Sequence, residues 1–342
     1  AMIRSPAGCP RRHRRRRKVS PVSPEPRLVH IVDHVAGLDD RPAPEPGGAP
    51  AELVMVTVLD GFLDAGGAAA RAAASLGRAS GAVPGVATFA FTPLHVYRAA
   101  PPPISFVRDH YESYDAPRLV VRLLHDSAGT PFLLLQGPEP DNRWEAFCRA
   151  VREVVERFGV TRTISIGSVP MAVPHTRPIA ITHHAADPAL LIGESPWRGE
   201  LRIPSSAQAL LEVRLGEWGH AAMGFVAHIP HYLAQLDYPR AAVSLLEQVE
   251  IGGRLMVDLT ALRTETDARE AEIAAYLAAN PEVADVVAAL EQQYDAFARA
   301  EESGSNLLAA DEPLPTGEEI GQQFERFLAG LDGPDADNPG QA

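Results

Sequence analysis

The sequence predicts an α/β protein with a three-layer α/β/α core and a C-terminal all-helical extension. Three observations support this fold class. Hydrophobic residues make up 46% of the 342 residues, which is enough for a large core. Short apolar, β-branched runs alternate with amphipathic helical patterns as far as residue 257. Beyond that point only helical patterns follow.

The predicted core strands are short apolar runs bounded by turn residues. They cover residues 53–59, 86–91, 119–124, 132–135, 163–166, 179–182 and 224–229. The predicted core helices cover residues 68–79, 141–158, 205–218 and 232–249, the first because it is rich in alanine. Asp141 or Asn142 is the expected N-cap of the second helix, and Ser205 or Ser206 that of the third.

Composition divides the chain into four parts. We expect a disordered basic arm over residues 1–27, the α/β/α core domain over 28–257, the helical extension over 258–331 and a disordered tail over 332–342. Within the extension, helices are predicted over 259–279, 283–300 and 317–331, and Pro281 separates the first two. No apolar run approaches the roughly 20 residues that span a bilayer, so no membrane partner is expected.

The charge is distributed unevenly along the chain. Residues 1–18 hold eight basic side chains and no acidic one, whereas the rest of the chain holds 23 basic and 44 acidic side chains. An acidic body repels nucleic acid, so a nucleic-acid partner is not expected, although the basic arm could contact RNA, DNA or anionic lipid. Lys18 is the only lysine. The body therefore lacks the amine that a Schiff base, a pyridoxal cofactor, a Walker loop or a kinase-type nucleotide site requires.

Only two cysteines occur, Cys9 and Cys148. They cannot build a disulfide framework, so the sequence indicates a reducing compartment and a cytoplasmic location. Cys148 lies among Phe147, Val151 and Val154 in a helical pattern. We therefore interpret Cys148 as a small buried hydrophobic residue rather than a nucleophile.

Four segments, taken together and in order, carry a family resemblance. They read Leu-Asp-Gly-Phe-Leu-Asp-Ala-Gly-Gly-Ala at 59–68, Leu-Gln-Gly-Pro-Glu-Pro-Asp-Asn-Arg-Trp at 135–144, Val-Pro-His-Thr-Arg-Pro at 173–178, and Ile-Pro-His-Tyr-Leu-Ala at 229–234 followed by Tyr-Pro-Arg-Ala-Ala at 238–242. On these segments the chain, from about residue 28 to about residue 330, resembles the actinobacterial branch of the proteasome assembly chaperone type-two family.

This resemblance implies a core of the phosphorylase/hydrolase-like type and a homo-oligomer, with a trimer favoured. It also implies proteasome subunits as candidate partners. Eukaryotic and archaeal relatives chaperone the assembly of the proteasome α-ring through protein contacts, without chemistry. The fold implied by the resemblance therefore transfers to this chain more directly than a biochemical role does.

Two carboxylates follow predicted strands. Asp64 lies where an α/β sheet presents its C-terminal edge to ligands, so it is a candidate ligand-binding residue. Its oxygens could also accept N–H groups at the start of the alanine-rich helix, and we favour this capping interpretation. Glu139, which is held between two prolines, suits either a functional carboxylate or a salt bridge to Arg143 or Arg177.

The segment His175-Thr176-Arg177 is the most chemistry-like cluster in the sequence. It offers a titratable ring, a hydroxyl and a bidentate anion binder within three residues. The same groups would serve as hydrogen-bond anchors in an oligomer interface, and we favour that interpretation.

His231 and Tyr232 lie at a predicted strand-to-helix turn and are further candidates for a ligand or interface contact. The spacing of His228 and His231 does not match a helical zinc pair, and no cysteine or acidic third ligand is near them in the sequence. We therefore predict no metal site and no cofactor.

Two functional hypotheses follow. The leading one is a non-enzymatic chaperone or scaffold that acts as a homo-oligomer. The alternative is a small-molecule enzyme of phosphorylase or hydrolase type with a cleft near Asp64, Glu139, His175 and Arg177. In such an enzyme the four side chains would converge in one solvent-reachable pocket, whereas in a scaffold they would be dispersed or used in contacts.

Overall fold

The computed structural model describes residues 27–40, 52–61, 63–79, 85–98, 101–192 and 200–302. The chain forms two compact units that divide between Ala279 and Asn280, and each is described by itself. The predicted basic arm up to residue 26, the helix predicted over 317–331 and the predicted tail lie outside the described residues.

The first unit is built on an eight-stranded mixed sheet. Its strands are β1 (Val29–Ile31), β2 (Val54–Asp60), β3 (Gly85–Phe89), β6 (Val120–His125), β7 (Pro131–Pro138), β8 (Arg162–Met171), β9 (Ile181–Ala185) and β10 (Ala222–Pro230). They lie in the order β1-β3-β6-β7-β2-β8-β10-β9. The neighbours β7, β2, β8 and β10 run parallel, and antiparallel strands extend the sheet on both sides. Each predicted core strand is present, and β1 was not predicted because it is too short to show a pattern.

Helices pack on both faces of the sheet. One face packs against α1 (Ala68–Ala79), α4 (Pro239–Gly253) and α5 (Thr260–Ala279), and the other against α2 (Trp144–Phe158) and α3 (Ala207–Glu217). The predicted α/β class with C-terminal helices is therefore confirmed. The predicted helical extension is divided, however, because Leu262 and Ile273 bury α5 in the core of the first unit.

The helix starts show which side chains act as caps. At the start of α3 the Ser206 hydroxyl accepts a hydrogen bond from the Ala209 N–H, as predicted. The predicted cap of α2 is wrong, because this helix begins after Arg143, which has a left-handed φ of 57°. Asp141 instead accepts a hydrogen bond from the Val96 N–H, so its carboxylate holds a neighbouring loop.

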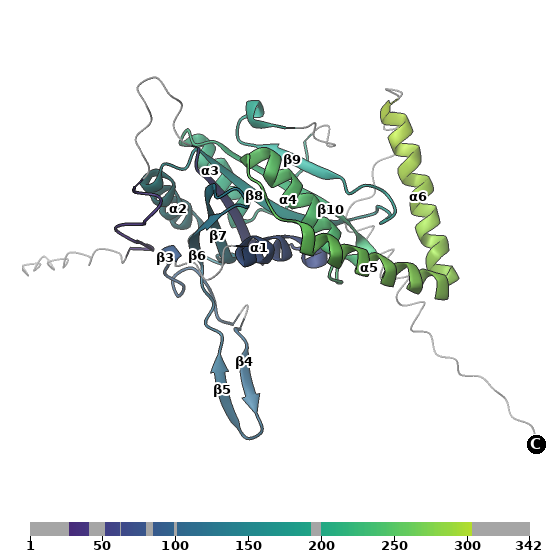
Figure 1. Ribbon diagram of the computed structural model, residues 1–342, viewed down its shortest axis with the longest axis horizontal. Helices are drawn as coiled ribbons and strands as arrows, with labels where there is room; N and C mark the ends of the chain where they lie inside the picture. Colours follow the sequence, from purple (N-terminus) through teal and green to yellow (C-terminus); the bar gives the residue numbers. More distant parts are fainter. Residues whose placement is uncertain are drawn as a thin grey trace, which may run out of the picture. The chain divides into compact units, whose positions relative to one another are not determined.

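A two-stranded hairpin, β4 (Ile104–Val107) and β5 (His110–Tyr114), interrupts the connection between β3 and β6. It extends away from the sheet (Figure 1), and every residue of both strands is exposed. The sequence did not predict this hairpin, because its strands pair only with each other and bury no apolar face. The start of α4 also differs from the prediction: a separate 3-10 turn covers His231–Leu233, and the helix begins at a proline, which is favoured at the first helical position.

The described part of the second unit is the helix α6 (Pro281–Glu302). It begins at the proline that was predicted to separate two helices. In the described residues no single helix is both long and apolar enough to span a membrane; α5 and α6 reach that length and composition only when they are counted together across their break.

Candidate functional site

A cleft of about 1110 Å³ opens at the C-terminal ends of β2 and β7. The chain leaves β2 toward α1 on one face of the sheet and leaves β7 toward α2 on the other face. Adjacent parallel strands whose connections diverge in this way leave a crevice at the sheet edge, which is the usual position of ligands in open α/β sheets. The position of this cleft makes it the candidate functional site.

One wall of the cleft is the alanine-rich face of α1. Ala70, Ala73, Ala74 and Gly77 line it at helical spacing. These small residues leave the space beside the helix open, since a Cβ atom added to Gly77 would meet no heavy atom within 4 Å. The alanine content that predicts the helix therefore also creates room for the cleft.

The opposite wall is the hairpin base, which we define as residues 101–103 and 115–118, and the floor is the sheet. Val58, Arg122 and Gln136 line the floor. Gln136 pairs with Val58 across β7 and β2, and strand alternation places Arg122 on the same face of the sheet. The floor therefore combines apolar, amide and guanidinium groups.

Two carboxylates lie at the sheet-edge end of the cleft. Asp60 ends β2 and Glu139 follows β7, and the Glu139 N–H donates to the Asp60 backbone carbonyl at 2.7 Å. Removal of solvent by the surrounding protein, together with the charge of Asp64, raises the pKa of Asp60. Removal of solvent also raises the pKa of Glu139. Both groups therefore hold a proton to a higher pH than ordinary carboxyl groups do.

Substitution of Asp60 by asparagine is expected to raise the free energy of unfolding more at pH 7 than at pH 4. The wild type loses stability as the pH rises from below the unfolded pKa through the raised folded pKa, because the folded state disfavours the carboxylate. Asparagine has no proton to lose, so the variant lacks this decline. Urea unfolding at a series of pH values measures the effect, with Asp109→Asn at the exposed hairpin tip as the control. Equal pH dependence in the wild type and Asp60→Asn would contradict the raised pKa.

Glu139 also fixes the start of α3. Its Oε1 accepts a hydrogen bond from the Gln208 N–H at 3.0 Å and so satisfies a donor of the first helical turn. The Gln208 side chain in turn joins two strands, because it accepts from the Leu59 N–H and donates to the Ile166 carbonyl. These backbone groups lie just beyond the last paired residues of β2 and β8. A side-chain amide therefore replaces ladder hydrogen bonds where the two strands separate.

Asp64 binds the N-terminal turn of α1, which is the interpretation favoured from the sequence. Its Oδ1 accepts from the Ala69 N–H at 2.8 Å, and its Oδ2 accepts from the Ala70 N–H at 3.0 Å. The Ser168 hydroxyl also donates to Oδ1, at 2.9 Å, which ties this loop to β8. The carboxylate is therefore used in the structure itself, and Asp64 is not among the residues that line the cleft.

His175 and Tyr232 lie together, 57 residues apart in the sequence. The His175 backbone N–H donates to the Tyr232 hydroxyl oxygen at 2.9 Å, and the ring Nδ1 lies 2.7 Å from the same oxygen. Since that hydroxyl accepts the first bond, it can donate its own hydrogen to Nδ1. Arg240 donates to the His175 carbonyl at 2.8 Å, and the His231 ring lies edge-on to the Tyr232 ring. The loop after β8 is thus held against the connection between β10 and α4.

The structure brings together only some of the predicted site residues. His175, His231 and Tyr232 form one cluster. The side chains expected to form an enzyme cleft do not meet there: of Asp64, Glu139, His175 and Arg177, only Glu139 lines the cleft.

The other predicted contacts also differ from expectation. Glu139 caps a helix start, and among the described residues it forms no ion pair with Arg143 or Arg177. Arg143 is exposed in front of α2. Thr176 is exposed as well, and its hydroxyl accepts from Arg177 Nη1 at 3.3 Å. Within the segment 175–177, His175 is therefore held in place by Tyr232, whereas Thr176 and Arg177 lie nearer the surface.

Asp60, Arg118 and Arg122 all line the cleft, and none of them was predicted as a site residue. Asp60 carried a usable signal, because an acidic residue that ends a buried strand lies at the ligand edge of an α/β sheet. The two arginines carried none, since only the sheet register places them beside that strand. In the described part of the chain, no three His, Cys, Asp or Glu side chains are grouped so that they could hold a metal ion.

Comparisons with known proteins place this architecture among related structures. The model of the PAC2 family matches residues 58–277. A Mycobacterium tuberculosis protein of unknown function is 44% identical, with 82% of this chain and 93% of that chain covered and a TM-score of 0.75. A Corynebacterium glutamicum protein of unknown function is 32% identical, with 79% and 97% covered and a TM-score of 0.71. A Mycobacterium tuberculosis proteasome-assembly chaperone homologue is 27% identical, with 69% and 100% covered and a TM-score of 0.62. No curated protein matched the chain.

Proposed function

The chain belongs to the PAC2 family, and on that premise we propose that it is a non-enzymatic protein-assembly chaperone or scaffold. It acts as a cytoplasmic homo-oligomer, with a trimer favoured, and its clients are proteasome subunits. One relative supports this class of client, because it is described as a proteasome-assembly chaperone homologue. A core of the phosphorylase/hydrolase-like type is part of the same proposal, and the mixed sheet with helices on both faces supports it.

The exposed β4–β5 hairpin is the observation that carries this proposal. Its large apolar side chains are half exposed or more: Ile104 is 51% exposed, Phe106 60%, Tyr111 69% and Tyr114 50%. The Phe106 and Tyr111 rings pack against each other, with centroids 5.2 Å apart. An isolated two-stranded hairpin is only marginally stable, and a contiguous exposed apolar patch is typical of a protein contact site. The hairpin therefore offers a surface for another protein rather than for a small substrate.

The separation of the predicted polar residues also supports a scaffold. An enzyme of the expected type needs Asp64, His175 and Arg177 beside Glu139 in one cleft. Asp64 is instead bonded to the start of α1, and His175 is bonded to Tyr232. These side chains hold loops and helix ends in place, which is what a rigid binding surface requires.

The double variant Phe106→Ser/Tyr111→Ser is expected to reduce recovery of proteasome α-subunits in an affinity pull-down by about tenfold or more, because it removes two aromatic anchors. The matched control is Leu201→Ser/Ile203→Ser, which removes two apolar side chains of similar exposure outside the hairpin. Light scattering gives the mass of each variant. Lost client recovery at unchanged mass assigns the hairpin to the client, and a lower mass assigns it to the homo-oligomer. If recovery and mass both stay at the wild-type level, the proposal loses its main support.

The cleft favours a second candidate function, a small-molecule enzyme of phosphorylase or hydrolase type. Asp60 and Glu139 place carboxyl groups of raised pKa at the ligand edge of the sheet, as proton-transfer residues often are. Such an enzyme would depend on Asp60 rather than on the residue set predicted from the sequence. Turnover of a phosphate or carboxylate ester that is lost in Asp60→Asn, with client recovery unchanged, would favour this second function.

A further inference from the structure

Three arginines line the cleft, and in the part of the chain that the structure describes two of them, Arg118 and Arg122, form no ion pair. Arg118 precedes β6 and is exposed, and Arg122 lies within β6 and is half-buried. Among the described residues neither takes part in an ion pair, whereas Arg71, Arg157 and Arg214 each pair with a carboxylate. A guanidinium is always charged, so a half-buried one without a counter-charge is disfavoured, and a bound anion would offset that cost.

The backbone fixes the position of both arginines. Arg122 pairs with Leu134 of β7, in the interior of the sheet. The Arg118 carbonyl lies against Gly137, where even a Cβ atom would not fit. Both arginines also line an adjoining cavity of about 550 Å³. Two guanidiniums on rigid neighbouring backbone therefore face the same open space.

The aromatic part of the cleft lining suits an apolar or ring-shaped group. The rings of Phe91 and His95 stack at 4.0 Å, with 6° between their planes. The Trp144 ring is held by its N–H, which donates to the Pro140 carbonyl at 2.6 Å. Ala74, on the α1 wall, adds little bulk of its own. A planar body of modest size would therefore pack between these aromatic groups and the small residues of α1.

The sheet-edge end of the cleft carries the opposite charge. Asp60 lines it, and among the described residues its side chain has no hydrogen-bond or ion-pair partner. We propose that the cleft binds a small organic anion. Its phosphate or carboxylate group contacts Arg118 and Arg122, its apolar body contacts Phe91 and His95, and a hydroxyl or amine donates to Asp60. The fork of an arginine matches both kinds of anion. This site goes beyond the assembly role and does not depend on it.

Titration calorimetry with phenyl phosphate and with benzoate tests this site, because each probe joins an anionic group to a ring. Stronger binding of one probe tells whether the site takes a phosphate or a carboxylate. The double variant Arg118→Gln/Arg122→Gln is expected to weaken binding by about tenfold or more, since it removes charge-assisted hydrogen bonds. Arg149→Gln, which changes an exposed arginine of α2 outside the cleft, is expected to bind as the wild type does.

A second variant tests the position of the probe independently of charge. Ala74 is exposed on the cleft side of α1, so Ala74→Trp fills the cleft without disturbing the core. We expect this variant to keep the wild-type circular dichroism spectrum and to lose probe binding. The proposal is overturned if neither probe binds the wild type at millimolar concentration, if the arginine double variant binds as tightly as the wild type, or if binding survives Ala74→Trp.

Discussion

Replacement of Gly137 by alanine is expected to lower the free energy of unfolding by about 3–5 kcal/mol. Gly137 has a φ of +136°, which side chains of L-residues rarely adopt. A Cβ atom at this position would overlap the Arg118 carbonyl oxygen and lie 2.8 Å from the Cα of Leu119. Both neighbours are backbone atoms where the chain enters β6, so neither can move without displacing the strand. Urea unfolding followed by far-UV circular dichroism measures the loss.

Gly129→Ala is the matched control for this substitution. Gly129 also has a positive φ, of +84°, but an added Cβ atom would meet no heavy atom within 4 Å. Only backbone strain applies there, and we expect a loss of about 1 kcal/mol. If both variants lose the same small amount, the close approach between Gly137 and Arg118 does not constrain the fold.

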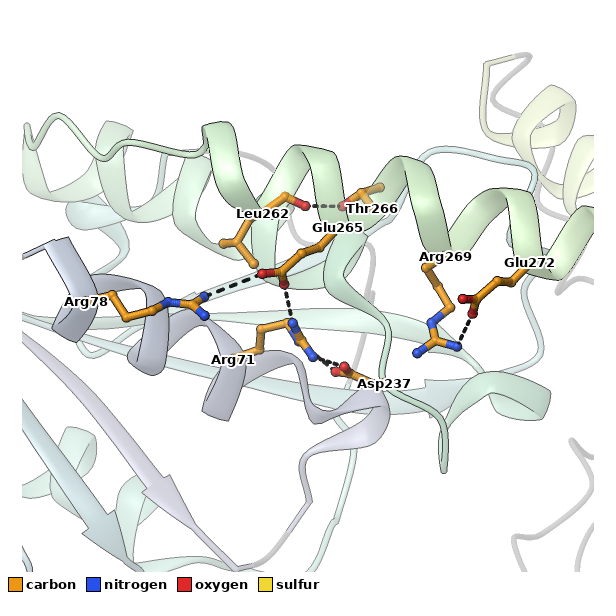
Figure 2. Close-up of polar contacts among 8 residues, drawn as sticks. All are labelled: Arg71, Arg78, Asp237, Leu262, Glu265, Thr266, Arg269 and Glu272. Carbon is orange, nitrogen blue, oxygen red and sulfur yellow. Dashed lines mark hydrogen bonds and ion pairs between the residues drawn. The ribbon is translucent and has the colours of Figure 1, made fainter.

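Replacement of Arg71 by methionine is expected to lower the free energy of unfolding by about 2 kcal/mol. Arg71 lies on α1, and its side chain is only 25% exposed. Figure 2 shows its guanidinium between Asp237, which precedes α4, and Glu265, which lies on α5. Its Nε donates to Asp237 at 2.7 Å, and its Nη1 donates to Glu265. Methionine keeps much of the apolar stem but removes the positive charge that the two carboxylates share, while Glu265 keeps its longer contact with Arg78 at 3.9 Å. This expected loss of stability lies between the loss for an exposed ion pair and the loss for a buried ion pair, because solvent reaches part of the contact.

The ion pair of Arg269 with Glu272 provides the control. Figure 2 shows both residues on α5, three positions apart and away from the Arg71 contacts. Such a pair within one helix is worth about 0.2–0.5 kcal/mol, so Arg269→Met should change stability little. Hydrogen exchange should be faster across α5 in Arg71→Met than in Arg269→Met. The stability difference should also shrink in high salt, because exposed charges are screened. Equal exchange in both variants would show that Arg71 does not hold α5 against α1.

Much of the fold could be predicted from local pattern. The alanine-rich run gives α1 its observed bounds, and Ser206 caps α3 as expected. Pairing with a neighbouring strand explains why one strand is longer than predicted. The apolar run of β7 stops at Leu135, but the strand continues through Gly137 to Pro138, because these residues pair with Leu59 and Asp60 of β2. Local propensity disfavours glycine and proline in a strand, and the neighbouring strand overrides it.

The candidate site was less predictable, because it is made by tertiary contacts. Glu139 was recognised as a rigidly held carboxylate, but its partner, the Gln208 N–H, belongs to a helix 69 residues away. His175 and Tyr232 were identified separately, and only the fold shows that they share a hydrogen bond. In the sequence, Arg122 is a single polar residue in an apolar strand. The register of β6 with β7 is needed to place it in the cleft.

The hairpin base belongs to both of the proposed binding surfaces. Residues 101–103 and 115–118 carry the exposed hairpin and also form a wall of the cleft, so an event at either surface acts on the same short stretch of backbone. Thermodynamic linkage then sets a fixed relation: if an anion in the cleft changes the affinity of the hairpin for its partner by some factor, the partner changes the affinity of the cleft for the anion by that same factor. The extent of assembly would then depend on the concentration of a small anion. The coupling can be measured by titrating either the anion or the partner.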